Sequence, residues 1–312
     1  MPSIITKGAM SASAFGFAGN AVTKKGIFVG VSGSSSSICY SYDGINWTLV
    51  NNAMPGNSWH SVAFGNGVFV AVSANNSGSA YSYDGIHWYA ATLASNMWVG
   101  VKFVGGIFIT GGQNNYYATS TDGINWTLTF NSNVGYDFAY AYGAIWTPTG
   151  TGAIIKSTDG GNTWSAAITM ANIGNMNISI AYDPISGKLV GTSYNGFAAA
   201  YSTNGGATWY NSANANAIAA NGEFLTCVNG VFLAADYQST TIARSTDGNT
   251  WASVSLFPCY TFAAGNGIVV AIEYNSFITA YSTDNGLTWT TNTVGTHLNS
   301  QWTGVCFGTV AA

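Results

Sequence analysis

The sequence is poor in charge, and this scarcity limits what its surface can bind. Only 6% of its 312 residues are charged, with 7 Lys and Arg against 11 acidic residues. Soluble domains usually carry about a quarter, and no basic run supplies the field that gathers phosphate backbones. We therefore expect no nucleic-acid partner, and a neutral surface of hydroxyl and amide groups that suits sugars better.

Long apolar segments are also missing. The start, MPSIITKGAM, lacks the positive region followed by an apolar region that marks a secretion signal, and no stretch of about 18 apolar residues occurs. We expect a protein that is made in the cytoplasm without a signal peptide and that does not insert into a membrane.

Cysteine and histidine are scarce and scattered. No CxxC spacing indicates a zinc site, and no close pairing indicates a disulfide framework. The three histidines lie outside any nucleophile-elbow pattern, and no EF-hand loop is present. We expect no metal, no cofactor, and four buried free thiols in apolar runs, namely Cys39, Cys227, Cys259 and Cys306.

Seven copies of one short pattern follow one another along the chain. They read SYDGINW, SYDGIHW, STDGINW, STDGGNTW, STNGGATW, STDGNTW and STDNGLTW, and they end at Trp47, Trp88, Trp126, Trp164, Trp209, Trp251 and Trp289. Successive tryptophans are 41, 38, 38, 45, 42 and 38 residues apart, a period in the range of four-stranded propeller blades. The repeats predict an all-β fold, a seven-bladed β-propeller of four-stranded antiparallel blades, as a single domain over residues 21–312.

The strands of one repeat can be predicted in more detail. Short apolar runs predict strands over residues 61–65, 68–72, 80–84 and 87–91. An Asn-Gly pair between alternating apolar runs indicates a tight hairpin, because both turn residues need positive φ. Such pairs occur at Asn66-Gly67, Asn229-Gly230 and Asn266-Gly267, with variants at Gly105-Gly106 and Ser186-Gly187.

The last segment, QWTGVCFGTVAA, matches the first strand of a repeat but has no blade after it. We expect this C-terminal strand to close the ring by pairing with the blade that residues 27–50 begin, which removes exposed sheet edges. The stretch ASAFGF near the start of the chain is the alternative closing strand.

The seven copies resemble the Asp-box, or BNR, repeat Ser-x-Asp-x-Gly-x-Thr-Trp, which occurs in sialidases, other glycosidases and sugar-binding propellers. The resemblance covers nearly the whole chain and implies a fold rather than an activity. It implies a turn in which Asp accepts backbone N–H bonds, Gly has positive φ and Trp packs beneath. In the fifth copy Asn204 replaces Asp, and its amide oxygen can accept the same bonds.

Catalysis has little support from the residues. A sialidase grips its substrate carboxylate with three arginines, whereas this chain has one, Arg244. A glycosidase needs two carboxylates across a cleft. We expect no catalytic residues and no enzyme, with a polysaccharide-degrading glycosidase as the alternative; the acids left for it, in or beside loops on one face, are Asp137, Glu223, Asp236 and Glu273.

Aromatic and amide side chains gather in the loops between second and third strands, on the face where the channel should open. Rings stack on the C–H faces of sugars and amides bond hydroxyls, although the same residues also serve simply to solvate loops. The ligand-binding candidates are Gln113, Asn115, Tyr116, Tyr194, Asn195, Tyr237, Gln238, Tyr274 and Asn275.

Three further tryptophans, Trp59, Trp98 and Trp302, share one repeat position just before the first strand of adjacent blades. A tryptophan there is either a stacking platform for a sugar or partner, or a wedge between blades. We count all three among the ligand-binding candidates.

The opening ITKGAMSASAFGF is similar to the start of many structural proteins of tailed phages, and the VAFGNGVFVAV repeat resembles phage-encoded propellers. This resemblance implies a virion protein of the tail or fibre, with residues 1–20 as a docking arm or an extra strand. The leading hypothesis is a propeller that binds host cell-surface glycan. The alternative is a purely structural or decoration protein whose partners are other virion proteins.

Overall fold

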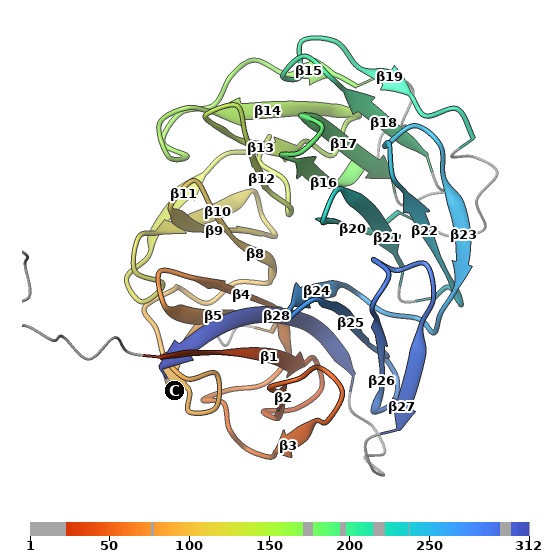
Figure 1. Cartoon of the computed structure of the whole chain (residues 1–312). Coiled ribbons are helices and arrows are strands. Elements are labelled where there is room, and N and C mark those ends of the chain that lie inside the picture. Colours follow the sequence, from red (N-terminus) through yellow and green to blue (C-terminus); the bar gives the residue numbers. More distant parts are fainter. Residues whose placement is uncertain are drawn as a thin grey trace, which may run out of the picture.

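The chain folds into a ring of seven four-stranded antiparallel sheets around a central channel (Figure 1). This computed structural model describes residues 23–75, 78–170, 177–193, 198–214, 222–236, 238–293 and 301–311. The predicted all-β, seven-bladed β-propeller is confirmed. No helix within these ranges is long and apolar enough to cross a membrane.

Each blade runs from an innermost strand at the channel to a short outer strand. Blade 1 contains β28 (Trp302–Ala311), β1 (Lys24–Ser32), β2 (Ile38–Ser41) and β3 (Thr48–Val50). Blade 2 contains β4 (Trp59–Gly65), β5 (Val68–Ser73), β6 (Ser79–Ser82) and β7 (Tyr89–Ala90). Blade 3 contains β8 (Trp98–Val104), β9 (Ile107–Gly112), β10 (Tyr116–Ser120) and β11 (Thr127–Phe130). Blade 4 contains β12 (Ala139–Ala141), β13 (Ala144–Pro148), β14 (Ala153–Ser157) and β15 (Ile168–Thr169).

The remaining three blades follow the same order. Blade 5 contains β16 (Asn177–Asp183), β17 (Lys188–Ser193), β18 (Ala199–Ser202) and β19 (Tyr210–Asn211). Blade 6 contains β20 (Phe224–Val228), β21 (Val231–Ala235), β22 (Thr241–Ser245) and β23 (Ala252–Ser255). Blade 7 contains β24 (Phe262–Gly265), β25 (Ile268–Ile272), β26 (Ile278–Ser282) and β27 (Thr290–Thr293).

The hairpins between innermost and second strands turn as their sequences predict. Asn66 and Gly67 have φ of 49° and 79°, the left-handed conformation that a two-residue turn requires, and the other two Asn-Gly pairs share it. The Ser186-Gly187 variant differs, because only Gly187 has positive φ there. In that longer turn the Asp183 carboxylate accepts hydrogen bonds from the backbone N–H groups of Ile185 and Ser186.

The recurring Ser-x-Asp turn joins the third and fourth strands and is held by its own side chains. In blade 1 the Asp43 carboxylate accepts bonds from Ile45 N and from Asn46 N, at 2.9 and 2.8 Å. Gly44 has φ of 73°, and the Trp47 indole donates to Gly44 O at 3.1 Å. In blade 5 Asn204 Oδ1 accepts from Thr208 N at 3.0 Å, so the amide replaces the carboxylate as predicted.

The lowered pKa values of the turn carboxylates lead us to expect a loss of stability in acid. Burial raises the pKa of Asp84, but hydrogen bonds from His87, Ile86 and Ser82 outweigh it and lower that pKa from 3.8 to about 2. A carboxyl whose folded pKa is lowered stabilises the native state above its unfolded pKa, and this stabilisation disappears as the pH falls towards the folded value. We expect the free energy of unfolding, measured by urea denaturation, to decrease between about pH 4 and about pH 2.

Two single substitutions test the origin of that decrease. Asp84→Asn removes one titrating turn and should make the pH profile shallower, whereas Asn204→Asp adds one and should make it steeper. Identical profiles for both variants and the unsubstituted chain would show that the turns do not cause the acid sensitivity.

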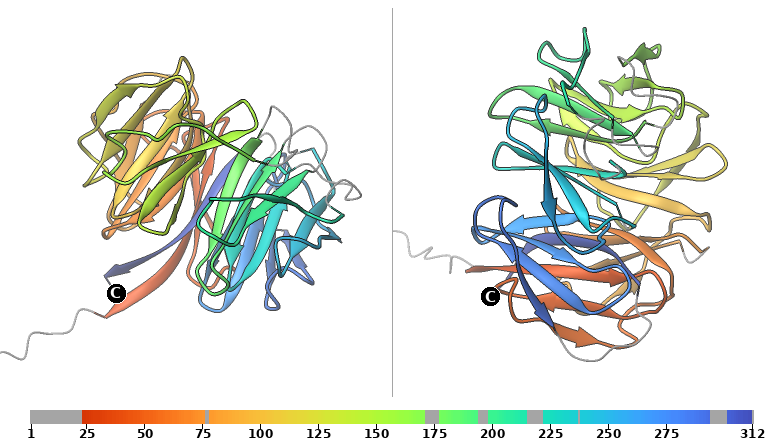
Figure 2. Two further views of the ribbon diagram at one scale, coloured as in Figure 1. Left: turned by 90° about the horizontal axis from the view of Figure 1, so that it is seen from above. Right: turned by 90° about the vertical axis from the view of Figure 1, so that its right-hand side faces the viewer.

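The ring is closed by the C-terminal strand, as predicted. β28 pairs antiparallel with β1 from Lys24↔Ala311 to Ser32↔Trp302, so the last strand of the chain forms the inner edge of the first blade. The two strands lie side by side in every view (Figures 1 and 2). Closure pairs the β1 edge that would otherwise be exposed.

Phenylalanines of the innermost strands pack over glycines of the neighbouring blade. Phe103 of blade 3 covers Gly65 of blade 2, where a Cβ atom would lie 2.0 Å from the ring. Phe64 covers Gly308 in the same way, and Phe307 covers Gly265. These contacts between a phenylalanine of one blade and a glycine of the next fit adjacent blades together.

Candidate functional site

The mouth of the central channel is a cavity of about 300 Å³ bounded by all seven blades. Its wall consists of the innermost strands, in several blades along most of their length, together with the residues that precede β12. We call this space the mouth cavity. Its polar lining includes His60, Ser61, Lys102, Asp137, Ser179, Glu223, Thr261 and Thr303.

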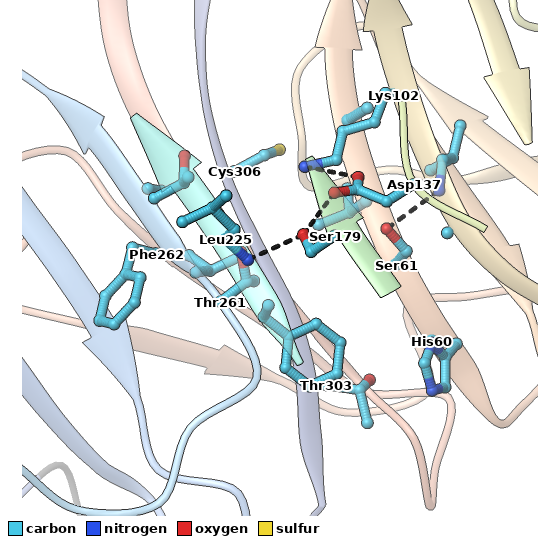
Figure 3. A pocket seen from close by; sticks show the side chains of 18 of the residues that line it. His60, Ser61, Lys102, Asp137, Ser179, Leu225, Thr261, Phe262, Thr303 and Cys306 are labelled. Carbon is cyan, nitrogen blue, oxygen red and sulfur yellow. Dashed lines mark hydrogen bonds and ion pairs between the residues drawn. The ribbon is translucent and has the colours of Figure 1, made fainter. Parts of the chain in front are cut away.

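A hydrogen-bond network on one side of the mouth cavity connects four blades (Figure 3). Asp137, before β12, lies 3.3 Å from Lys102 Nζ of β8 and accepts a bond of 2.5 Å from Ser179 Oγ of β16. Ser179 Oγ in turn accepts from Leu225 N of β20 at 2.9 Å. Asp137 is half-buried, and its cationic partner is the ammonium group of Lys102. These opposite charges make the network neutral overall.

Glu223 enters the mouth cavity from the residue just before β20. Its Oε2 atom is buried and has no hydrogen-bond partner among the residues that the structure describes. Burial, followed by repulsion from the Asp236 carboxylate, raises the pKa of Glu223 from 4.5 to about 8. At neutral pH Glu223 is therefore a carboxylic acid with a proton to donate.

His60 lines the mouth cavity from the second residue of β4. Its Nδ1 lies 2.6 Å from Val99 O, and because a carbonyl only accepts, Nδ1 carries the hydrogen and Nε2 is the acceptor. Burial lowers the pKa of His60, more than the Val99 bond raises it. The Tyr260 ring lies 5.5 Å from His60 and 4.6 Å from Phe224, so an aromatic cluster joins the two sides of the mouth.

Of the four acids proposed for a glycosidase, two line the mouth cavity and two do not. Asp137 and Glu223 line it. Asp236 is buried behind it with one oxygen bonded to Gln238 N at 2.9 Å, and Glu273 accepts a bond from Ser276. The sequence prediction left out His60, although its place at the start of a first strand, like that of Glu223, was a usable signal.

A second hollow, which we call the aromatic groove, lies on blade 3 at the same face. It has a volume of about 180 Å³ and is lined by Ala94, Ser95, Asn96, Trp98, Asn114, Tyr116 and Leu128. Tyr116 is 37% exposed and lies edge-on to Phe130, itself 62% exposed, with 5.5 Å between ring centroids. The predicted residues Gln113 and Asn115 are exposed beside it. None of the lining residues is charged.

Trp59, Trp98 and Trp302 do start the innermost strands of adjacent blades, but all three are buried, at 0%, 0% and 1% exposure. Each packs in a cluster that joins two blades. The indoles of Trp59 and Trp98 donate to Gly56 O and Ala94 O. This burial leaves no open ring face to receive a sugar, so it speaks against the stacking-platform interpretation and favours wedges between blades; Trp98 is as buried as the others although it borders the aromatic groove.

The other predicted ligand residues lie apart from the aromatic groove. Tyr274 is half-buried with its ring 5.0 Å from that of Tyr260, at the channel mouth, and Asn275 is exposed beside it. Gln238 is exposed in blade 6. The candidates Tyr194, Asn195 and Tyr237 lie outside the described residues.

Thiols and metal ligands do not form a site in the described part of the chain. Cys39 and Cys259 are buried free thiols as predicted, whereas Cys227 and Cys306 are partly exposed. Burial raises the pKa of each thiol, for Cys227 to about 12, so the thiolate form is disfavoured. No group of three His, Cys, Asp or Glu gathers there to hold a metal ion.

Comparison with known proteins supports the fold and little beyond it. No family model matches, and no curated protein matches. Among solved structures, virginiamycin B lyase from Staphylococcus aureus is similar with a TM-score of 0.63 at 14% identity, covering 77% of this chain and 85% of that one. YCF48 bound to D1 peptide gives 0.55 at 19%, covering 75% and 81%. Apo AztD from Citrobacter koseri gives 0.52 at 8%, covering 91% and 86%.

The chain is thus a seven-bladed β-propeller whose structural neighbours include a lyase, YCF48 and binding proteins. The expectation that it is not an enzyme is overturned, because enzymes stand among the similar structures. At such low identities the similarity concerns the fold alone. Function must be argued from the channel mouth and the aromatic groove.

Proposed function

We propose that this propeller recognises neutral host-surface glycan through the aromatic groove of blade 3. The observation that carries the proposal is the uncharged hollow between Tyr116, Leu128 and Asn114, with Phe130 exposed beside it. Ligand sites of this kind combine aromatic and apolar walls with a few polar groups that fix orientation. Asn114 has positive φ of 61° at the loop tip, is exposed, and lines the groove with Tyr116.

The composition of the surface supports a neutral ligand. The groove lining holds neither acid nor base, and the whole chain is only 6% charged. Binding should therefore depend little on ionic strength, in contrast to recognition of a charged polymer. The Asp-box resemblance of the repeats, found in several sugar-binding propellers, agrees with this class of ligand.

Glycan binding is tested by substituting the exposed ring of the groove. We expect Tyr116→Ala to weaken binding to a panel of bacterial surface glycans by at least about tenfold, or about 1.4 kcal/mol, because a stacking surface is lost. Phe130→Ala should have a smaller effect in the same direction. Affinity would be measured by glycan array and then by calorimetry on the glycans that bind.

Tyr210→Ala is the matched control. Tyr210 is 51% exposed on the outer strand of blade 5 and packs against Tyr201 at 5.7 Å, outside the groove. Its removal should leave glycan affinity unchanged. Equal losses in the Tyr116 and Tyr210 variants would mean that binding is not located at the groove.

We further propose that the propeller acts as part of a virion, near the tail or fibre. This rests on the opening ITKGAMSASAFGF, which lies outside the described residues. If no glycan on a broad panel binds, the neutral face would instead contact other virion proteins. Recovery of the chain with purified particles, but not with glycan, would then favour that structural role.

A further inference from the structure

We propose that the mouth cavity is a second binding site, for a neutral, hydroxyl-bearing ligand the size of one sugar ring, with Glu223 as hydrogen-bond donor and His60 as acceptor. The site is separate from the aromatic groove and goes beyond the function proposed for it. Its volume of about 300 Å³ is at the lower end of the range for small-molecule sites.

The first observation is the unsatisfied carboxyl of Glu223. Buried polar atoms are almost always hydrogen-bonded, and one without a partner costs roughly 1–3 kcal/mol. Glu223 Oε2 has no partner in the described part of the chain, although it borders the cavity. A ligand hydroxyl would supply the missing partner.

The second observation is the complementary chemistry of His60. Its Nδ1 is engaged by Val99 O, which leaves Nε2 as a lone-pair acceptor. A neutral acid and a neutral imidazole around one cavity offer a donor and an acceptor. A sugar hydroxyl group both donates and accepts, so neighbouring hydroxyls of one ring match this pair.

The third observation is the balance of charge around the cavity. Lys102 and Asp137 form an ion pair and neutralise each other. Asp236, behind Glu223, disfavours an anion, and the raised pKa of Glu223 leaves it without the charge that a cation would need. Phe224, next to Glu223 in the sequence, lines the same cavity. A neutral polar ligand is the class that remains.

The groups around Glu223 fix the expected pH dependence. They are Asp236 after β21, together with His60 of β4 and the Lys102–Asp137 pair, which line the same cavity; Cys259 is near Asp236, and its thiol remains protonated. Ligand binding needs neutral Glu223, so it is present below the Glu223 pKa of about 8 and is lost as the pH rises through it. Binding also needs neutral His60 and decreases when that group is protonated below its lowered pKa. Affinity should therefore pass through a maximum near neutral pH.

The experiment uses the full chain carrying Tyr116→Ala, so that the aromatic groove does not contribute. The probes are the methyl glycosides of glucose, galactose and mannose at millimolar concentrations. Their binding is monitored by NMR signals of the side-chain carboxyl and imidazole groups. At least one glycoside should shift the Glu223 and His60 signals and raise the Glu223 pKa, because the ligand binds the protonated form. Affinity should decrease about tenfold per pH unit above the Glu223 pKa.

Three variants make the result specific. Glu223→Gln keeps a donor that does not titrate, so binding should persist and its decrease at alkaline pH should disappear. Glu223→Ala should weaken binding at least about tenfold, and Glu273→Gln, in a loop of blade 7, should change nothing. The proposal is overturned if no glycoside moves the Glu223 signal, or if Glu223→Ala binds as well as the parent. Either result leaves the groove proposal untouched, because both are read from Glu223 and in a chain whose groove Tyr116→Ala has already weakened.

Discussion

Removal of residues 302–312 is expected to abolish cooperative unfolding of the propeller. These residues form β28, which pairs with β1 along its whole length and contributes the buried side chains of Trp302 and Val305 to the contact with blade 7. Loss of one buried tryptophan typically costs about 3–5 kcal/mol, and here the inner strand of a blade is lost as well. The sum approaches the whole stability of a typical domain, about 5–15 kcal/mol.

Circular dichroism during heating would show this as a broad, low-temperature loss of signal. Removal of residues 1–20 is the matched truncation and should leave the melting temperature almost unchanged, because β28 already occupies the inner position of blade 1. Asp84→Ala, which breaks one local turn, should lower the melting temperature far less than the C-terminal truncation. A C-terminal truncation that melts like the full chain would mean that the N-terminal residues can replace β28.

Gly111→Ala is expected to destabilise the fold strongly, because Gly111 of blade 3 packs directly on the backbone of the segment that leads into blade 4. A Cβ atom at Gly111 would lie 2.1 Å from the backbone oxygen of Gly135, which cannot rotate away as a side chain would. A Cβ atom built on Gly135 would in turn lie 2.1 Å from Pro148 O, so the segment around Gly135 is itself closely packed on β13 and has little room to shift away from Gly111. We expect a loss of more than about 3 kcal/mol, above the usual cost of overpacking.

Gly150→Ala is the control, since nothing lies within 4 Å of its added Cβ. It should change the free energy of unfolding by less than about 0.5 kcal/mol. The loss of stability caused by Gly65→Ala should lie between those of Gly111→Ala and Gly150→Ala, because the Phe103 side chain that the new Cβ atom would meet can move. Urea denaturation of the three variants measures the order directly, and equal stabilities for Gly111→Ala and Gly150→Ala would show that the blades separate easily.

The fold was predictable because the repeat itself is the unit of packing. One blade cannot bury both of its faces alone, so the seven copies of the Trp-containing pattern require seven stacked sheets. The Asn66-Gly67 turn was predictable for a local reason, its two positive φ values. The corresponding turn of blade 4, Tyr142-Gly143, was not, because Tyr142 adopts φ of 53° without any local preference for it.

The sites were less predictable because their members come from different strands of a blade or from different blades. Tyr116 and its amide neighbours were identified from one loop. Phe130, the ring that packs on Tyr116, lies on the next strand and carries no motif. His60 and Glu223 are far apart in sequence and reach the same cavity from blades 2 and 6. Burial of Trp59 also depends on a neighbouring blade, and a tryptophan in sequence alone fits a wedge or a platform equally well.

The pairing of Lys24 with Ala311 decides how the propeller is presented to its surroundings. Thr303, near the start of β28, lines the mouth cavity, whereas Ala311 ends the strand at the opposite face, and β1 begins there beside it. The start of β1 and the end of β28 therefore lie side by side at that face (Figure 2). An anchor attached at either strand end would hold the propeller by the face opposite the channel mouth. The channel mouth and the aromatic groove would then point away from the anchor.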